Sequence, residues 1–254
     1  MKLFATDYDG TLLVDGNIKT EDLSSIDQWK ANGHLFVIDT GRSMESILEQ
    51  VQKYLLPVDY FITNNGGMAF DAQKNEIFST YLEPILAVDI MYMAKMVGSI
   101  VSYVVNDGFY RHRILVNDQL EDKRYPDLAC DMSEAQLHAQ GKYAQIVLSM
   151  DTKEQALQLE KRLNAHFSDG IVAYANQYVV DVVPKNISKA TGIARICERH
   201  HIAKQDVYTL GDGNNDIPLI TYGLHGAAVS WASKDVQAHA SQVVDSIAEL
   251  LGGE

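Results

Sequence analysis

The chain has 254 residues, of which 46% are apolar and 22% are charged, and its formal net charge at pH 7 is -13. This is an ordinary globular composition, long enough for one large domain or two modest ones. The negative charge argues against a nucleic-acid backbone or an anionic membrane as the main partner. A phosphorylated ligand would therefore have to be bound through a metal ion and a few individually placed cations.

The cysteines and the apolar segments bear on the cellular compartment. Cys130 and Cys197 are far apart and belong to no metal-ligand spacing, so we expect two reduced thiols. The chain does not open with a positively charged leader and an apolar stretch, and no apolar run approaches the roughly 18 residues of a membrane span. These features predict a cytoplasmic protein.

Short apolar segments alternate with amphipathic segments in the first third of the chain. The expected strands are residues 3–6, 34–39 and 60–63, and the expected helices are residues 20–32 and 43–55. The first strand shows no alternation of apolar and polar residues, as is typical of a parallel strand buried on both faces. Strands that alternate with helices predict parallel crossover connections.

The pattern changes near residue 82. Strands in this part follow one another closely, so that residues 100–105 and 109–116 flank a turn at Asn106-Asp107-Gly108, which predicts an antiparallel hairpin. The remaining expected elements are helices 84–97 and 152–167 and strands 144–150, 171–175 and 179–183. A mixed sheet with its own helices can form its own core, so we expect a second domain at residues 82–183.

After Pro184 the parallel pattern returns, with a helix at residues 188–201 and strands at 207–210, 226–229 and 242–244. We therefore expect residues 1–81 and 184–254 to form one core. The predicted fold class is α/β, a doubly wound, parallel, Rossmann-like core with an inserted α+β domain.

Polar side chains follow several of these strands, at the point where each strand ends. They are Asp7, Asp9, Thr40, Asn64, Asn65, Asp212 and Asp216. Because ligands of open α/β sheets bind at the carboxyl ends of the strands, we expect these side chains to converge. Paired carboxylates repel each other unless a cation or a shared proton lies between them, and Mg²⁺ is the obvious candidate.

The motifs that carry these residues resemble a known family. In chain order they are Asp7-Tyr-Asp-Gly-Thr-Leu12, Thr40-Gly-Arg42, Lys189 and Gly211-Asp-Gly-Asn-Asn-Asp216. They look like the signature motifs of the haloacid dehalogenase (HAD) superfamily. Within it, the chain resembles the Cof-type phosphatases of subfamily IIB, whose cap domain (C2B type) is inserted where residues 82–183 lie. Tyr8 departs from the pattern, since an aliphatic residue is usual at its position.

The resemblance implies a role for each motif residue. Asp7 would be the nucleophile that forms an aspartyl-phosphate, Asp9 the acid/base, and Thr40 and Lys189 the catalytic residues that hold the phosphoryl oxygens. Gly41 and Asn215 would assist in binding the phosphate. The implied Mg²⁺ ligands are Asp7, Asp9 through its backbone carbonyl, Asp212 and Asp216, the last directly or through water.

The leading hypothesis is therefore a magnesium-dependent phosphatase for small phosphomonoesters, such as sugar phosphates or cofactor and nucleotide phosphates. Two alternatives stay open: a sugar phosphomutase with the same core, and a non-catalytic sensor of a phosphorylated ligand. We expect a small-molecule phosphorylated substrate, no nucleic acid and no membrane as partner, and a monomer or homodimer.

Overall fold

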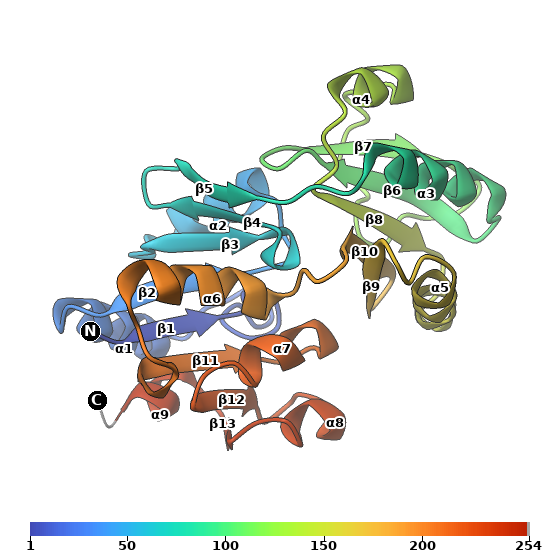
Figure 1. Cartoon of the computed structure of the whole chain (residues 1–254). Helices are drawn as coiled ribbons and strands as arrows, with labels where there is room; N and C mark the ends of the chain where they lie inside the picture. The colour runs from blue at the N-terminus through green and yellow to red at the C-terminus, as the bar shows by residue number, and fades with distance from the viewer. Residues whose placement is uncertain (253–254) are drawn as a thin grey trace. The chain divides into compact units, whose positions relative to one another are not determined.

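The computed structural model describes residues 1–252, which form two compact units (Figure 1). The first unit comprises Met1–Arg42, Ile47–Phe78 and the chain from Ser188 onward, and the second comprises Ser43–Ser46 and Ser79–Ile187. The expected boundaries, 82–183 for an inserted cap and 1–81 with 184–254 for the core, lie near these limits, and the cap assignment stays a prediction.

The first unit is built on an eight-stranded sheet with the order β13-β12-β11-β1-β2-β3-β4-β5. Neighbouring strands from β13 to β3 are parallel, and β4 is antiparallel to β3. The strands are β1 (Leu3–Thr6), β2 (Leu35–Asp39), β3 (Tyr60–Thr63), β4 (Met68–Asp71), β5 (Glu76–Ser79), β11 (Val207–Gly211), β12 (His225–Val229) and β13 (Gln242–Val244). The expected parallel α/β core is thus confirmed.

Helices cover both faces of this sheet, which explains the uninterrupted apolar sequence of β1. Leu3 and Ala5 pack against α6, whereas the ring of Phe4 meets Trp29 of α1 on the opposite face, at a centroid distance of 6.3 Å. The helices of this unit are α1 (Thr20–Ala31), α2 (Met44–Tyr54), α6 (Lys189–His200), α7 (Ile217–Ile220), α8 (Lys234–Gln237) and α9 (Ile247–Leu251). Within residues 1–252, no helix is both long and apolar enough to cross a membrane.

The second unit has a five-stranded antiparallel sheet with the order β7-β6-β8-β10-β9. Its elements are α3 (Pro84–Met96), β6 (Ile100–Asn106), β7 (Arg111–Leu115), α4 (Glu134–Gln140), β8 (Gln145–Met150), α5 (Lys153–His166), β9 (Ile171–Asn176) and β10 (Val179–Pro184). Apolar residues of α3 and α5 form the main core with one face of the sheet, while Tyr125 and Leu128 pack on Val104 and Val147 of the other face. The expected hairpin of β6 and β7 is present.

The short helices α7, α8 and α9 were not anticipated from the sequence, and neither were two further parts of the fold. Residues 68–79 form β4 and β5, which extend the core sheet beyond β3. In the second unit, α4 begins after Ser133, whose hydroxyl accepts the backbone N–H of Gln136 in a capping box. Both are short elements, for which the apolar periodicity is too brief to stand out from loop sequence.

A buried histidine links two aspartates in the second unit. Nε2 of His112 lies 3.2 Å from Oδ2 of Asp107, and Nδ1 lies 3.0 Å from Oδ2 of Asp131. Burial disfavours the charged imidazole, but the hydrogen bonds and charges of the two carboxylates outweigh it and raise the pKa of His112. The protonated form of His112 therefore stabilises the folded chain.

We predict a pH-dependent stability difference between the wild type and His112→Asn. Because the pKa of His112 is raised on folding, its contribution is fully present below the unfolded value of about 6.5 and is lost as the pH rises through the folded pKa. The difference in melting temperature should be large near pH ~6 and small near pH ~9. His166→Asn, at an exposed position of the same unit, serves as the control. A difference that stays constant over this range would contradict the prediction.

The turn after β3 brings the chain close to the start of α6. Gly66 has φ +99°, and a Cβ atom at this position would lie 1.9 Å from the carbonyl oxygen of Ser188. Gly33 also has a positive φ, +79°, but nothing lies within 4 Å of its Cβ position. Of these two glycines, Gly66 alone combines backbone strain with a steric clash.

We predict that Gly66→Ala destabilises the protein more than Gly33→Ala. Both variants should lose about 1–2 kcal/mol from the left-handed backbone, and Gly66→Ala should lose about 1–3 kcal/mol more because the start of α6 must move. Urea-induced unfolding of the two variants and the wild type measures the difference. Equal losses would show that the close approach to Ser188 is unimportant.

Candidate active site

The register of the central strands brings the sequence motifs to one edge of the first unit's sheet. Thr6, the last residue of β1, pairs with Ile38 of β2 and with Leu210 of β11. The backbone N–H of Asp7 continues this ladder and donates to the carbonyl of Leu210 at 2.9 Å. The residues that follow the three strands, starting from Asp7, therefore lie next to one another.

Lys189 is the cation of this edge. It is the first residue of α6, its side chain is completely buried, and its Nζ lies 2.5 Å from Oδ1 of Asp7 and 2.5 Å from Oδ1 of Asp216. Burial works against the charged form, but the carboxylates of Asp216 and Asp7 raise the pKa of Lys189 above its usual value. The ammonium is thus a fixed positive charge between two carboxylates.

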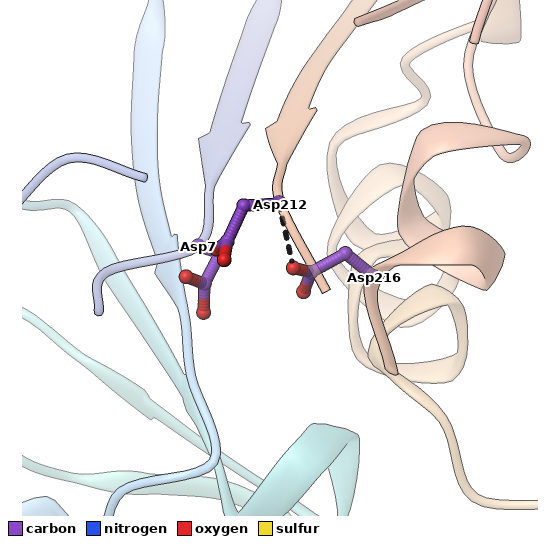
Figure 2. A group of neighbouring side chains, drawn as sticks. All are labelled: Asp7, Asp212 and Asp216. Carbon is purple, nitrogen blue, oxygen red and sulfur yellow. Dashed lines mark hydrogen bonds between the residues drawn. The ribbon is translucent and has the colours of Figure 1, made fainter. Parts of the chain in front are cut away.

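The loop after β11 brings Asp212 and Asp216 beside Asp7 (Figure 2). Oδ2 of Asp216 accepts the backbone N–H groups of Asp212 at 3.0 Å and Gly213 at 2.8 Å, which closes the loop. Carboxylate oxygens of Asp7, Asp212 and Asp216 all lie within 4.8 Å of one another. Figure 2 shows the three carboxylates directed toward a common region from the ends of β1 and β11.

These carboxylates repel one another in a largely buried environment. Burial raises the pKa of Asp7 well above its usual value, and Lys189 opposes this effect. Burial together with the charge of Asp216 raises the pKa of Asp212 to about 6. Additional positive charge at this position would therefore be favourable.

The donor set fits Mg²⁺. Magnesium prefers oxygen ligands in octahedral geometry and is usually held by one or two carboxylates together with several waters. Asp7 and Asp212 offer such oxygens, whereas Oδ1 of Asp216 is engaged by Lys189 and Oδ2 by the loop N–H groups. Asp7 and Asp212 could therefore coordinate Mg²⁺ directly, and Asp216 could contribute through water.

Apart from Lys189 at the start of α6, the expected phosphate-binding side chains are those of Thr40, directly after β2, and Asn215, in the loop after β11. The Thr40 side chain is buried, and the Thr40 backbone N–H donates to the carbonyl of Ile62 at 2.9 Å. Asn215 donates from Nδ2 to Oδ1 of Asn65 at 3.0 Å, and the backbone N–H of Asn65 donates to the carbonyl of Thr40. Hydrogen bonds thus connect the segments that contain Thr40, Asn65 and Asn215.

The side chain of Asp9 does not join the cluster of Asp7, Asp212 and Asp216. Its two oxygens instead accept from Nε and Nη2 of Arg42, each at 2.6 Å. Arg42 belongs to the motif Thr40-Gly-Arg42, but the motif alone predicts no role for it. The sequence shows an arginine two residues after Thr40. Its pairing with Asp9 depends on the directions of both side chains, which the spacing of the residues in the sequence does not define.

Asp39 is a further acid near the site that was not predicted from the sequence. It ends β2 directly before Thr40, is completely buried, and neither of its carboxyl oxygens has a hydrogen-bond partner in the described residues. Burial raises the pKa of Asp39 well above its usual value, although Lys189 opposes this. An acid as the last residue of an apolar strand was the signal that could have identified it.

Two contacts hold the loop after β1. The hydroxyl of Thr11 donates to Oδ1 of Asp212 at 2.7 Å, and the indole N–H of Trp231 donates to the carbonyl of Gly10 at 2.8 Å. Gly10 has φ +90°, and a Cβ atom there would lie 2.7 Å from Oδ2 of Asp212. Only glycine fits this close approach.

Comparisons with known proteins agree with this geometry. The family model of haloacid dehalogenase-like hydrolases matches residues 4–252. Two phosphatases from Bacillus subtilis that are named for 5-amino-6-(5-phospho-D-ribitylamino)uracil are similar: YcsE is 24% identical, with 97% of this chain and 90% of that protein covered, and YitU is 22% identical, with 89% and 86% covered.

Solved structures show the same fold. BT1666 from Bacteroides thetaiotaomicron, a HAD-superfamily phosphatase, superposes with a TM-score of 0.81 at 21% identity, over 98% of this chain and 91% of that chain. The match of the family model over nearly the whole length decides the assignment. The chain belongs to the haloacid dehalogenase-like hydrolases, in the Cof-type branch, and is an enzyme of the phosphoric monoester hydrolase class.

Proposed function

We propose that this enzyme is a magnesium-dependent phosphatase that hydrolyses small phosphomonoesters through an aspartyl-phosphate on Asp7. The observation that carries the proposal is the buried ammonium of Lys189 between Asp7 and Asp216, with Asp212 in the same cluster. A carboxylate nucleophile needs its surroundings to neutralise the charge of the incoming phosphoryl group, and these residues are suited to that task.

Asp7 is the nucleophile in this proposal. Its N–H is fixed by Leu210 and its Oδ1 by Lys189, so one carboxylate edge has a defined direction. Mg²⁺, held by Asp7 and Asp212, would draw charge from the phosphoryl oxygens. Lys189 would stabilise the same oxygens from the start of α6, where the helix N-terminus also favours an anion.

Asp9 moves the protons. As the oxygen of Asp7 bonds to phosphorus and the ester P–O bond breaks, Asp9 gives its proton to the leaving oxygen. In the second step a water oxygen bonds to phosphorus, its proton passes to Asp9, and the bond between Asp7 and phosphorus breaks. The carbonyl of Asp9 remains the proposed third protein ligand of Mg²⁺.

Thr40, Gly41 and Asn215 complete the proposed phosphate site. The hydroxyl of Thr40 and the backbone N–H of Gly41 would donate to phosphoryl oxygens, and the amide of Asn215 would assist. Thr40 and Asn215 are already connected through Asn65, which limits how far either can move. Such prior ordering lowers the entropy cost of positioning the phosphoryl group.

The substrate class follows from what the core residues can recognise. They bind a phosphoryl group and the metal, so the choice of leaving group falls to the second unit, in the role of a cap. The related Bacillus subtilis proteins are named for a phosphorylated ribityl compound. We therefore propose small phosphorylated metabolites, either sugar phosphates or cofactor and nucleotide phosphates, as substrates in the cytoplasm.

We predict that Asp7→Asn abolishes phosphatase activity. The amide is a poor nucleophile, so kcat for an aryl phosphate with Mg²⁺ should fall by about three orders of magnitude or more. Asp27→Asn, at an exposed position of α1, is the matched control and should retain full activity. Activity of Asp7→Asn within tenfold of the wild type, or wild-type activity that does not require Mg²⁺, would refute the proposal.

A further inference from the structure

Arg42 donates hydrogen bonds to both carboxylate oxygens of Asp9. Its Nε and Nη2 donate to Oδ2 and Oδ1, respectively, each at 2.6 Å, and the side chains of Arg42 and Asp9 are only 19% and 32% exposed. A planar guanidinium that meets a carboxylate through two bonds fixes both the position and the plane of that carboxylate. Such a pair restricts direction in a way that a single hydrogen bond does not.

The guanidinium of Arg42 lies over the aromatic ring of Tyr8. Tyr8 is completely buried, and Cζ of Arg42 lies 5.4 Å from the centre of its ring. The phenol of Tyr8 lies 3.4 Å from Oε1 of Gln50, so the ring is held at its far end as well. A cation over an aromatic face gains about 0.5–2 kcal/mol, which favours one position of the guanidinium.

The backbone of Arg42 belongs to the same motif as Thr40. Its N–H donates to Oγ1 of Thr40 at 3.1 Å, and its carbonyl accepts the N–H of Asn64 at 3.0 Å. Arg42 is therefore anchored next to the proposed phosphate-binding hydroxyl, while its side chain reaches back to Asp9 on the loop after β1. Arg42 thus connects the segment of Thr40, which would bind the phosphoryl group, with the segment of Asp9, which would protonate the leaving oxygen.

We propose that Arg42, supported by the ring of Tyr8, is a positioning residue that directs the carboxyl group of Asp9 toward the leaving oxygen. The inference rests on the proposed function of Asp9 as acid/base. Arg42 itself touches neither the nucleophile nor the phosphoryl group in this scheme. Its contribution is to limit the directions from which Asp9 can deliver a proton.

The dependence of the rate on the leaving group distinguishes this role from a merely structural one. An alkoxide is a poor leaving group and needs the proton of Asp9 as the P–O bond breaks, whereas a nitrophenolate leaves without it. The informative quantity is kcat/KM, because it reports the steps up to the first phosphoryl transfer. Misdirection of Asp9 should therefore lower kcat/KM for an alkyl phosphate selectively.

We predict that Arg42→Ala lowers kcat/KM for an alkyl phosphate such as glycerol phosphate by about 100-fold, the usual size of a general-acid contribution. For p-nitrophenyl phosphate the loss should stay below about fivefold, because proton transfer hardly contributes to that reaction. Added guanidinium, or the substitution Arg42→Lys, should restore part of the alkyl rate.

Two substitutions of Tyr8 test the contribution of its ring separately. Tyr8→Leu removes the ring and should reproduce the selective loss in weaker form, whereas Tyr8→Phe keeps the ring and should behave like the wild type. Arg195, which lies 4.4 Å over the ring of Phe78, offers a matched arginine and aromatic pair, so Arg195→Ala should leave both substrates unaffected. Melting temperatures of all variants identify any that fold poorly, and Arg42→Lys with Tyr8→Phe keeps the test possible in that case.

Three results would overturn the inference: equal losses for the alkyl and aryl substrates in Arg42→Ala, a rise in kcat/KM for the alkyl phosphate, or a selective loss that neither lysine nor guanidinium restores. Asp9→Asn separates this failure from failure of the proposed function. If Asp9→Asn shows no preference for the leaving group, the acid/base role of Asp9 is wrong. If Asp9→Asn is selective and Arg42→Ala is not, only the positioning role is wrong.

Discussion

The buried ion pair of Lys189 with Asp7 and Asp216 is the interaction on which the site depends. One ammonium, with no exposed surface, holds the carboxylates of Asp7, directly after β1, and Asp216, in the loop after β11. Removing one partner from such a group leaves an uncompensated buried charge, at a cost of about 3–5 kcal/mol. The nucleophile, the loop that carries Asp212 and the start of α6 are therefore stabilised together. The same charges that bind one another in the protein are those that would bind a phosphoryl group and its metal ion.

This arrangement is possible because helices cover both faces of the sheet in the first unit, so that the charged residues lie at one edge, after the carboxyl ends of the strands. Apolar residues of β1 pack alternately on α6 and on α1, so their register with β2 and β11 is strongly specified. The close approach of Gly66 to Ser188 packs the turn after β3 against the start of α6, where Lys189 lies. Arg42 engages the side chain of Asp9, which does not belong to the carboxylate cluster of Asp7, Asp212 and Asp216.

Much of this could be predicted from the sequence, because the relevant signals are local. Three elements can each be recognised from a few residues of sequence: the strand ahead of Asp7, the helix that begins at Lys189 and the loop from Gly211 to Asp216. The parallel register of the strands then brings them together. What could not be predicted depends on the direction of individual side chains across long sequence separations. The hydrogen bonds from Arg42 to Asp9 and from Trp231 to Gly10 are examples. Asp39 was missed because a buried, unbonded acid is recognised only once its surroundings are known.

In the proposed mechanism, Asp7 becomes phosphorylated during turnover. The direct measurement is rapid acid quenching of the enzyme during steady-state hydrolysis with Mg²⁺, followed by mass spectrometry of its peptides. The proposed mechanism predicts one added phosphoryl group on the peptide that contains Asp7, removable by hydroxylamine as expected of an acyl phosphate. Steady turnover with no phosphorylated peptide under conditions that preserve acyl phosphates, or with the phosphoryl group on another residue, would contradict it.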